Sequence, residues 1–356
     1  MHFDNGGMPK DYALYIRKKA VFIVCSFLLL AMLFFAGISL GPVRLELSQI
    51  ILALFPGAGS PRTELIVWNI RLPQAVAAVA AGAGLACAGA VMQSVLKNPL
   101  ASPFTLGISH AAAFGAALSV MVLGSGVMSH LPAAAPGISI PISTALCAFF
   151  FSALTAGLIT FISKRREAAP QVMVLTGVAL GSLYTAGTML LQFFADDVQL
   201  AAMVFWTFGD LARADWNDLW IMLGAVMPIL AFFLIRARSY NAMTLGDETA
   251  RGLGVNVEST RLSGMMAASL ATALIISFVG IISFVGLVAP HIVRRLIGDD
   301  HRFLIPAAMV FGGLILLGSD IAARLVLQPH LLPVSIFTSF LGAPVFIYLI
   351  IKGNKR

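Results

Sequence analysis

Apolar stretches separated by short polar segments repeat along nearly the whole chain. A helix needs roughly 20 apolar residues to cross the hydrocarbon core of a bilayer. Ten stretches approach this length, although Gly286 and Pro290 interrupt the eighth. We therefore predict an all-α polytopic membrane protein with ten transmembrane helices over residues 21–351, between short tails at 1–20 and 352–356. The predicted spans are Val21–Leu40, Leu72–Leu96, Phe104–Leu123, Ile140–Ile162, Val172–Phe194, Trp216–Ile235, Leu262–Ile282, Phe284–Ile297, Phe303–Leu325 and Val334–Ile351.

The 23 lysines and arginines are distributed unevenly between the two ends of these spans. With the N-terminus inside, 18 of them fall at inner ends and only five at outer ends. Cytoplasmic loops of membrane proteins carry an excess of Lys and Arg. The asymmetry predicts that both termini are cytoplasmic and that the number of spans is even. The five outer residues are Arg44, Arg62, Arg71, Arg213 and Arg324.

The second predicted span is unusually rich in small residues. Ala78, Gly82, Ala86 and Ala90 recur every four residues and so share one helical face. Membrane helices associate through close packing, which small side chains permit. We therefore predict that this span is a buried central helix, ended at the inner side by the Pro-broken turn at Lys97–Pro99.

The composition agrees with a membrane protein. Of the 356 residues, 59% are hydrophobic and 11% are charged, whereas soluble domains carry about 25% charged residues. The net charge of +7 fits basic cytoplasmic loops, and no basic patch is interleaved with aromatic residues, so no nucleic-acid partner is expected. Cys25, Cys87 and Cys147 lie inside apolar runs without metal-ligand spacing. We predict no metal site and no cofactor.

The sequence lacks the motifs that would power or catalyse a reaction. No G-x-x-x-x-G-K-[ST] occurs, so the chain has no P-loop for ATP. Asp320 is the best candidate for an intramembrane carboxylate, but Arg324 follows it four residues later, which favours a local ion pair over a proton relay. An ion-coupled secondary transporter is the first alternative. An intramembrane enzyme using His110 and His291 is the second, although no nucleophile or metal partner accompanies them.

Two segments outside the spans carry further information. Asp196–Asp215, on the outer side, contains an amphipathic piece long enough for a short surface helix. Residues 239–260 form the longest inner loop and the most polar stretch, and Leu245–Leu253 is expected to be helical. The acidic start and basic end of this helix complement its dipole. The loop is either a docking surface or an ordinary solvated loop, and its residues alone favour neither.

Several long motifs together carry a resemblance to a known family. The chain resembles the FecCD-type permease subunits of binding-protein-dependent ABC importers for iron–siderophore complexes, haem and cobalamin, and the resemblance extends from about Val21 to the end. The motifs are RLPQ (Arg71–Gln74), GAVMQSVLKNPLASPFTLGIS (Gly89–Ser109), TGVALG (Thr176–Gly181), LGDETARGLGV (Leu245–Val255), SFVGLVAPHIVRRLIGDDHRFLIP (Ser283–Pro306), DIAARL (Asp320–Leu325) and LGAPVFIYLI (Leu341–Ile350).

The resemblance implies a type II ABC importer permease in the bacterial inner membrane. It implies a homodimer surrounded by membrane lipid, with the translocation path between the subunits. Two ATPase subunits bind beneath, and a periplasmic or lipid-anchored binding protein docks on top. The chain is then a transport subunit for an iron chelate or cobalamin and not an enzyme. The ATPase-coupling residues implied by the family motif are Leu245, Gly246, Asp247, Glu248, Arg251, Leu253 and Gly254.

On the outer face, the resemblance implies that arginines meet acidic residues of the binding protein. The matching positions are Arg71 and Arg324, whereas a further family arginine falls at Gln74 and leaves that contact neutral. Arg62 is a possible substitute for the missing charge. The alternative for all three arginines is that they only anchor the chain at the lipid interface.

The resemblance places an inner gate at two segments, Gly107–His110 and Ala169–Gln171. It also assigns the lining of the path to the fifth and tenth spans. His110 stands where the family most often has Ser or Asn, so it is either a hydrogen-bonded structural residue or a contact for substrate and protons. The candidate gate and path residues are Gly107, Ser109, His110, Pro170, Gln171, Met173, Thr176, Met189, Gln192 and Phe193.

Overall fold

The computed structural model consists mainly of helices joined by turns over the residues it describes, which are 10–41, 43, 45–55, 57, 59–123, 140–328 and 330–353. Arg44 and the ends of both predicted tails, 1–9 and 354–356, lie outside the described residues. Ten helices coincide with the ten predicted spans. They are α1 (Lys10–Ser39), α4 (Leu72–Val95), α5 (Ile108–Leu123), α6 (Ile140–Lys164), α7 (Pro170–Phe194), α9 (Trp216–Ile235), α12 (Val257–Val279), α13 (Val285–Ile297), α14 (His301–Val326) and α15 (Val334–Gly353).

Length and apolar character divide these ten helices into three groups. Seven helical stretches in the described part of the chain are long and apolar enough to cross a membrane, while Ile108–Leu123 and Val334–Tyr348 are shorter apolar helices. The remaining helix, α13, has only 13 residues and contains Pro290. The predicted eighth span is therefore the weakest one, because a helix of this length is shorter than the hydrocarbon core.

Short helices fill the connections between the spans. The predicted outer surface helix is present as α8 (Asp197–Thr207), and the predicted inner helix is present as α11 (Asp247–Gly252), two residues later than expected at its start. The other connecting helices are α2 (Leu47–Ala53), α3 (Pro61–Ile66), the π-helical turn η1 (Val67–Arg71), the 3-10 turn η2 (Leu211–Arg213) and α10 (Ala237–Thr244).

Some predicted boundaries are wrong. The first helix begins at Lys10 instead of Val21, and the third begins at Ile108 instead of Phe104. Hydropathy detects only the apolar part of a helix, so a polar first turn such as that of α1 escapes it. Residues 102–107 instead form turns, in which the hydroxyl of Thr105 donates to the carbonyl of Ser102 at 2.8 Å.

The small-residue helix α4 is central, as the sequence predicted. Within the span that contains it, 83% of the most apolar window is buried. A Cβ atom on Gly82 would lie 2.4 Å from the carbonyl oxygen of Gly312, and one on Gly89 would lie 1.7 Å from that of Gly286. These approaches exclude any larger residue without movement of the backbone, so the glycines set how closely α4 packs on α13 and α14.

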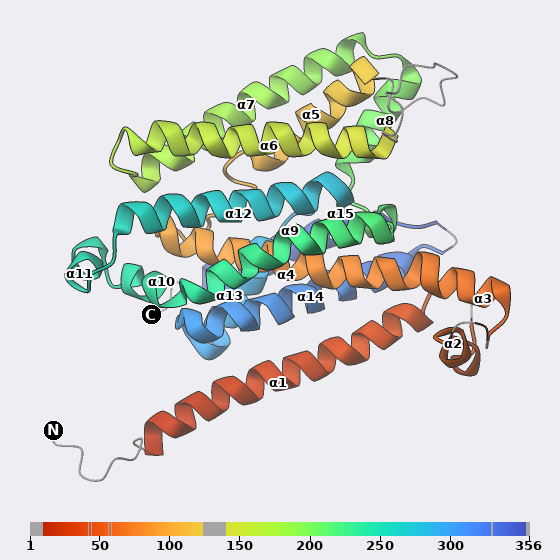
Figure 1. Ribbon diagram of the computed structural model, residues 1–356, viewed down its shortest axis with the longest axis horizontal. Helices are drawn as coiled ribbons and strands as arrows, with labels where there is room; N and C mark the ends of the chain where they lie inside the picture. The colour runs from red at the N-terminus through yellow and green to blue at the C-terminus, as the bar shows by residue number, and fades with distance from the viewer. Residues whose placement is uncertain are drawn as a thin grey trace.

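The helices at the edges of the bundle are far less buried than α4. Only 22% of the apolar window of α1 and 17% of that of α7 are buried. Figure 1 shows these two helices at opposite edges of the bundle, with α4 and α14 between them. It also shows α10, α11 and the start of α1 at one end, and α2, α3 and α8 at the other.

Candidate functional site

A pocket of about 330 Å³ collects several of the predicted path residues at one place. It lies between α5, α7, the end of α8 and the non-helical segment before α13. Four predicted residues, Ser109, His110, Met189 and Gln192, line it together. The sequence analysis missed the other lining residues, which are Phe104, Ala113, Thr185, Thr188, Thr207, Ile281 and Ser283.

A second pocket, of about 580 Å³, borders the first. The two share Thr207, Ile281 and Ser283, and the second adds Ser335 and Ser339 from α15. Together they form a lining of hydroxyl, amide and apolar side chains in which His110 is the one titratable group among the residues described. Such a lining can form weak hydrogen bonds with a polar solute without holding it tightly, as transport requires.

His110 lies at the start of α5 and faces this path. Its ring centroid is 5.5 Å from that of Phe104, and its Nδ1 atom is buried without a hydrogen-bond partner. The structure therefore provides no hydrogen bond at Nδ1 for the structural role considered above. His291 lies elsewhere, on α13, with its ring 6.4 Å from that of Phe346.

The turn before α5 fits closely against α7. Gly107 has φ of +76°, and a Cβ atom there would lie 2.6 Å from the carbonyl oxygen of Gly177. Only glycine combines this backbone conformation with such an approach. Gly107 thereby holds the turn at the predicted gate against the helix that lines the first pocket.

The remaining predicted path residues on α7 differ in exposure. Pro170 and Thr176 are half-buried, while Gln171 is exposed at the inner start of the helix. Met173 is fully buried and packs into the main core, so assigning it to the path was wrong. Phe193 is 80% exposed but does not line either pocket. The helical positions of Thr185, Thr188 and Gln192 share one face of α7, which lines the pocket, whereas Met173 lies on another face.

At the inner end, α10 and α11 are fixed to the bundle by polar contacts. The carboxylate of Asp247 accepts from Lys97 Nζ at 2.9 Å and from Arg261 Nη2 at 2.8 Å. On α10, the side-chain amide of Asn241 donates to Asp300 Oδ1 at 2.8 Å. The inner loop is therefore held against the bundle by these contacts.

Electrostatics favours the charged form of these inner carboxylates. Burial raises the pKa of Asp247, but hydrogen bonds from Lys97 and Arg261 outweigh this effect and bring its pKa below the ordinary value. Hydrogen bonds from Arg302 hold the pKa of Asp300 far below the ordinary value, against the opposing effect of burial. Both contacts therefore persist throughout the physiological pH range.

The predicted ATPase-coupling residues form an exposed face around α11. Leu245 and Leu253 are 65% and 63% exposed, and Glu248 and Arg251 are also exposed. Gly246 and Gly254, at φ of +113° and +82°, form the turns that bring the two leucines to either end of the helix. Asp247 is the one predicted residue of this set that faces the bundle, through its contacts with Lys97 and Arg261.

At the outer end, the predicted docking arginines have partners within the chain. Arg71 is 3% exposed and donates to the backbone carbonyls of Ile38, Ser39 and Val43. Arg324 is 6% exposed and pairs with Asp320 at 2.8 Å, which confirms the predicted local ion pair. The part of Arg71 and Arg324 in docking stays a prediction. Arg62, the third predicted docking residue, is exposed.

Gln74 completes this outer cluster. Its side-chain amide donates to Asp320 Oδ1 at 2.9 Å, so the residue that replaces the family arginine is bonded within the chain. A small pocket of about 210 Å³ brings Arg71, Gln74, Asp320 and Arg324 together with Asp210. It gives the outer face a polar depression whose charges are balanced by the chain itself.

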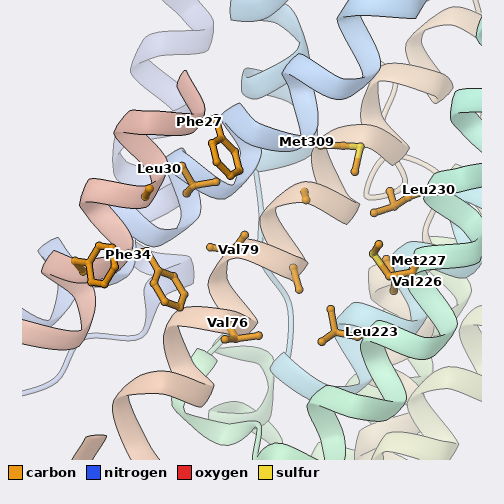
Figure 2. Close-up of a pocket in the computed structure, with 14 residues that line it drawn as sticks. Phe27, Leu30, Phe34, Val76, Val79, Leu223, Val226, Met227, Leu230 and Met309 are labelled. Carbon is orange, nitrogen blue, oxygen red and sulfur yellow. The ribbon is translucent and has the colours of Figure 1, made fainter. Parts of the chain in front are cut away.

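An apolar pocket on the opposite side does not suit a polar solute. It has a volume of about 420 Å³ and lies between α1, α4 and α9, where Phe27, Val79, Met227 and Leu230 point into it (Figure 2). All 14 lining residues are apolar. Without a polar group to orient a ligand, it differs from the hydroxyl-lined pockets on the α7 and α15 side.

The comparisons with known proteins agree with one another. The model of the FecCD transport family matches residues 29–352. The chain is 47% identical to the ABC transporter permease protein MJ0087 of Methanocaldococcus jannaschii, over 98% of this chain and 99% of that protein. It is 38% identical to the vitamin B12 import system permease protein BtuC of Klebsiella pneumoniae, over 83% and 86% of the two chains.

A solved structure shares the arrangement of helices. It is that of a metal-chelate type ABC transporter in an inward-facing conformation, with a TM-score of 0.79 and 26% identity over 94% of this chain and 99% of that one. The fold is therefore that of a type II ABC importer permease. Because the family model covers most of the chain and close relatives cover nearly all of it, the chain belongs to the FecCD transport family.

Proposed function

We propose that this chain is the membrane-spanning half of an ATP-driven importer that carries a metal chelate into the cell. The observation that carries the proposal is the pair of hydroxyl-rich pockets between α5, α7, α15 and the non-helical segment before α13, whose lining contains no Asp, Glu, Lys or Arg among the described residues, in a chain of this family. A metal chelate such as cobalamin or an iron–siderophore or haem complex is bulky and polar. A lining of this kind lets such a cargo pass while the binding protein supplies the affinity.

ABC permeases are membrane subunits, and separate subunits hydrolyse the ATP, so the chain is not itself an enzyme. Two ATPase subunits would dock on the inner face at α11. The exposed Leu245 and Leu253 supply apolar contacts there, and Glu248 and Arg251 supply charges of both signs. Aromatic or aliphatic anchors surrounded by polar groups are typical of protein interfaces.

A second copy of the chain would complete the path. Helix α7 leaves large apolar side chains exposed, and the two pockets lie on the same side of the subunit. A path lined by one subunit alone would open into lipid, whereas a two-fold partner would enclose it. The most exposed of these residues are Leu175, Leu183, Met189, Leu190, Phe193 and Phe194.

The remaining assignments concern location and the outer partner. The excess of lysine and arginine at one end supports a cytoplasmic position for α10, α11 and both termini, and the proposed membrane is a bacterial inner membrane. A periplasmic or lipid-anchored binding protein would then dock on the outer face. Arg62 is exposed for this contact, while Arg71 and Arg324 lie almost buried in the polar depression at the same end. Rim charges of this kind mainly govern the rate and register of docking.

Reconstitution tests the proposal. Vesicles containing the chain, its ATPase and its binding protein should accumulate cobalamin, haem or a ferric siderophore only when ATP is supplied. Each candidate cargo is compared for stimulation of ATP hydrolysis, and vesicles with the chain alone serve as the control. Accumulation by the chain alone under an ion gradient would instead support the secondary transporter. The described spans favour the importer, because Asp320 is already paired with Arg324.

A further inference from the structure

One buried arginine joins three segments at the inner end of the molecule. Arg261, in the first turns of α12, is only 3% exposed. Its Nε donates to the carbonyl of Val95 at 2.8 Å, and its Nη1 donates to the carbonyl of Ala168 at 3.3 Å. Its Nη2 donates to both carboxylate oxygens of Asp247, at 2.8 and 3.0 Å. A single guanidinium thus contacts the end of α4, the α6–α7 loop and α11.

Each of the three contacted segments borders a functional region. Val95 is the last residue of α4, immediately before the turn that leads to Gly107 and His110. Ala168 immediately precedes the predicted gate loop at the start of α7. Asp247 is the first residue of α11, which carries the exposed leucine face. The arginine therefore lies between the proposed ATPase contact and both segments of the predicted gate.

Lys97 also belongs to this network, and two of the residues in the network have a positive φ. Lys97 follows α4 and pairs with Asp247 at 2.9 Å, so α11 is connected to the end of α4 both directly and through Arg261. Lys97 and Ala168 have φ of +50° and +52°, which non-glycine residues adopt at some energetic cost. Both residues adopt this positive φ beside the end of a helix, and both contact the Arg261–Asp247 pair. A rigid, planar guanidinium can fix several acceptors relative to one another, which a lysine ammonium cannot do in the same way.

We propose that Arg261 is a positioning residue that transmits displacement of α11 to the two gate segments. The role rests on the proposed docking of the ATPase at α11. When the ATPase moves α11, the bidentate contact with Asp247 pulls on the guanidinium, and the guanidinium carries the carbonyls of Val95 and Ala168 with it. Continuous polar contact is a route for coupling, and its test is a response at one end to a ligand at the other.

The test measures how the gate responds to nucleotide. Gln171, which is exposed at the start of α7, is changed to cysteine after Cys25, Cys87 and Cys147 have been replaced by serine. The rate of maleimide labelling is measured in the complex with the ATPase, with and without a non-hydrolysable ATP analogue. We expect nucleotide to change this rate in the otherwise unaltered chain. In Arg261→Gln the ATPase should stay bound while the nucleotide effect falls at least fivefold.

Two further variants keep the experiment decisive. Arg213→Gln is the control, because Arg213 also donates to backbone carbonyls, those of Phe205 and Trp206, but lies at the outer end and has no assigned docking role, so it should retain the full response. Arg261→Lys keeps the buried charge, and should give a partial response even if Arg261→Gln fails to fold.

The possible failures are distinguishable. A full nucleotide effect in the Arg261 variants, or no effect in a wild-type chain that does bind the ATPase, overturns the relay. If the wild-type chain does not bind the ATPase at all, the proposed function fails first.

Discussion

Buried arginines lie at both ends of the molecule, but they differ in the number of chain segments that they connect. At the outer end, Arg71 and Arg324 donate to carbonyls between Gly37 and Val43 and so hold a single segment, the end of α1 and the residues after it. At the inner end, Arg261 joins three separate segments. The same chemistry therefore fixes one segment at the outer end and joins three separate segments at the inner end.

The carboxylate partners sharpen this difference. Asp320 lies in the same helix as Arg324 and is 3% exposed, so the outer ion pair is internal to α14. The side chain of Asp247 is 31% exposed and belongs to a six-residue helix at the surface. A buried pair within one helix cannot report movement of a partner protein, whereas a pair that links a surface helix to the core can.

The largest effect is expected at the outer ion pair. Asp320→Ala leaves the guanidinium of Arg324 buried without its carboxylate, which typically costs about 3–5 kcal/mol. We expect a lower unfolding temperature in detergent and reduced yield of folded protein. Asp320→Asn, which keeps the hydrogen bond with Gln74 possible, serves as the milder control. Equal stability of Asp320→Ala and the wild type would show that Arg324 is solvated after all.

The next effect concerns the anchor on α1. Arg71→Ala leaves the carbonyls of Ile38, Ser39 and Val43 without their donor. Only the bond to Ile38 is fully buried, and leaving one buried acceptor unsatisfied costs about 1–3 kcal/mol. Hydrogen exchange should accelerate across residues 37–43 and remain unchanged at α11. Acceleration at α11 as well would contradict the separation between the two ends.

The ion pairs that Asp247 forms with Arg261 and Lys97 should weaken at low pH only. The pKa of Asp247 is lowered in the folded chain, so its ion pairs are complete above the ordinary value of 3.8 and are lost as the pH falls through the folded value. Hydrogen exchange of α11, corrected for intrinsic rates, should therefore be equally slow at pH 7 and pH 5 and should rise only below about pH 4. Loosening of α11 already at pH 6 would show that another group controls it.

The smallest effect is expected at Lys97. Its side chain is 39% exposed, and ion pairs of this kind contribute about 0–1 kcal/mol. Lys97→Gln should leave the unfolding temperature nearly unchanged and preserve most of the nucleotide response at the gate. A loss as large as that of Arg261→Gln would move the centre of the junction from Arg261 to Lys97.

The sequence alone determined the class of the protein and its central helix. Apolar stretches of about 20 residues cross a bilayer as helices, because a helix satisfies the hydrogen bonds of the backbone N–H and C=O groups within each segment. Ala78, Gly82, Ala86 and Ala90 fall on one face by helical spacing alone, so their packing followed from local periodicity. The Asp320–Arg324 pair was predictable for the same reason, since residues four apart meet on one helix.

Only the tertiary structure decided which residues meet across distant parts of the chain. Arg261 carries no local signal that it would reach Val95, Ala168 and Asp247, because those contacts depend on how α4, α6, α11 and α12 pack together. The same holds for Thr207 and Ser283, which complete the pockets beside His110. The face of α7 that lines the pocket carries Thr185, Thr188 and Gln192, but only packing against the rest of the chain showed that Met173 lies in the core.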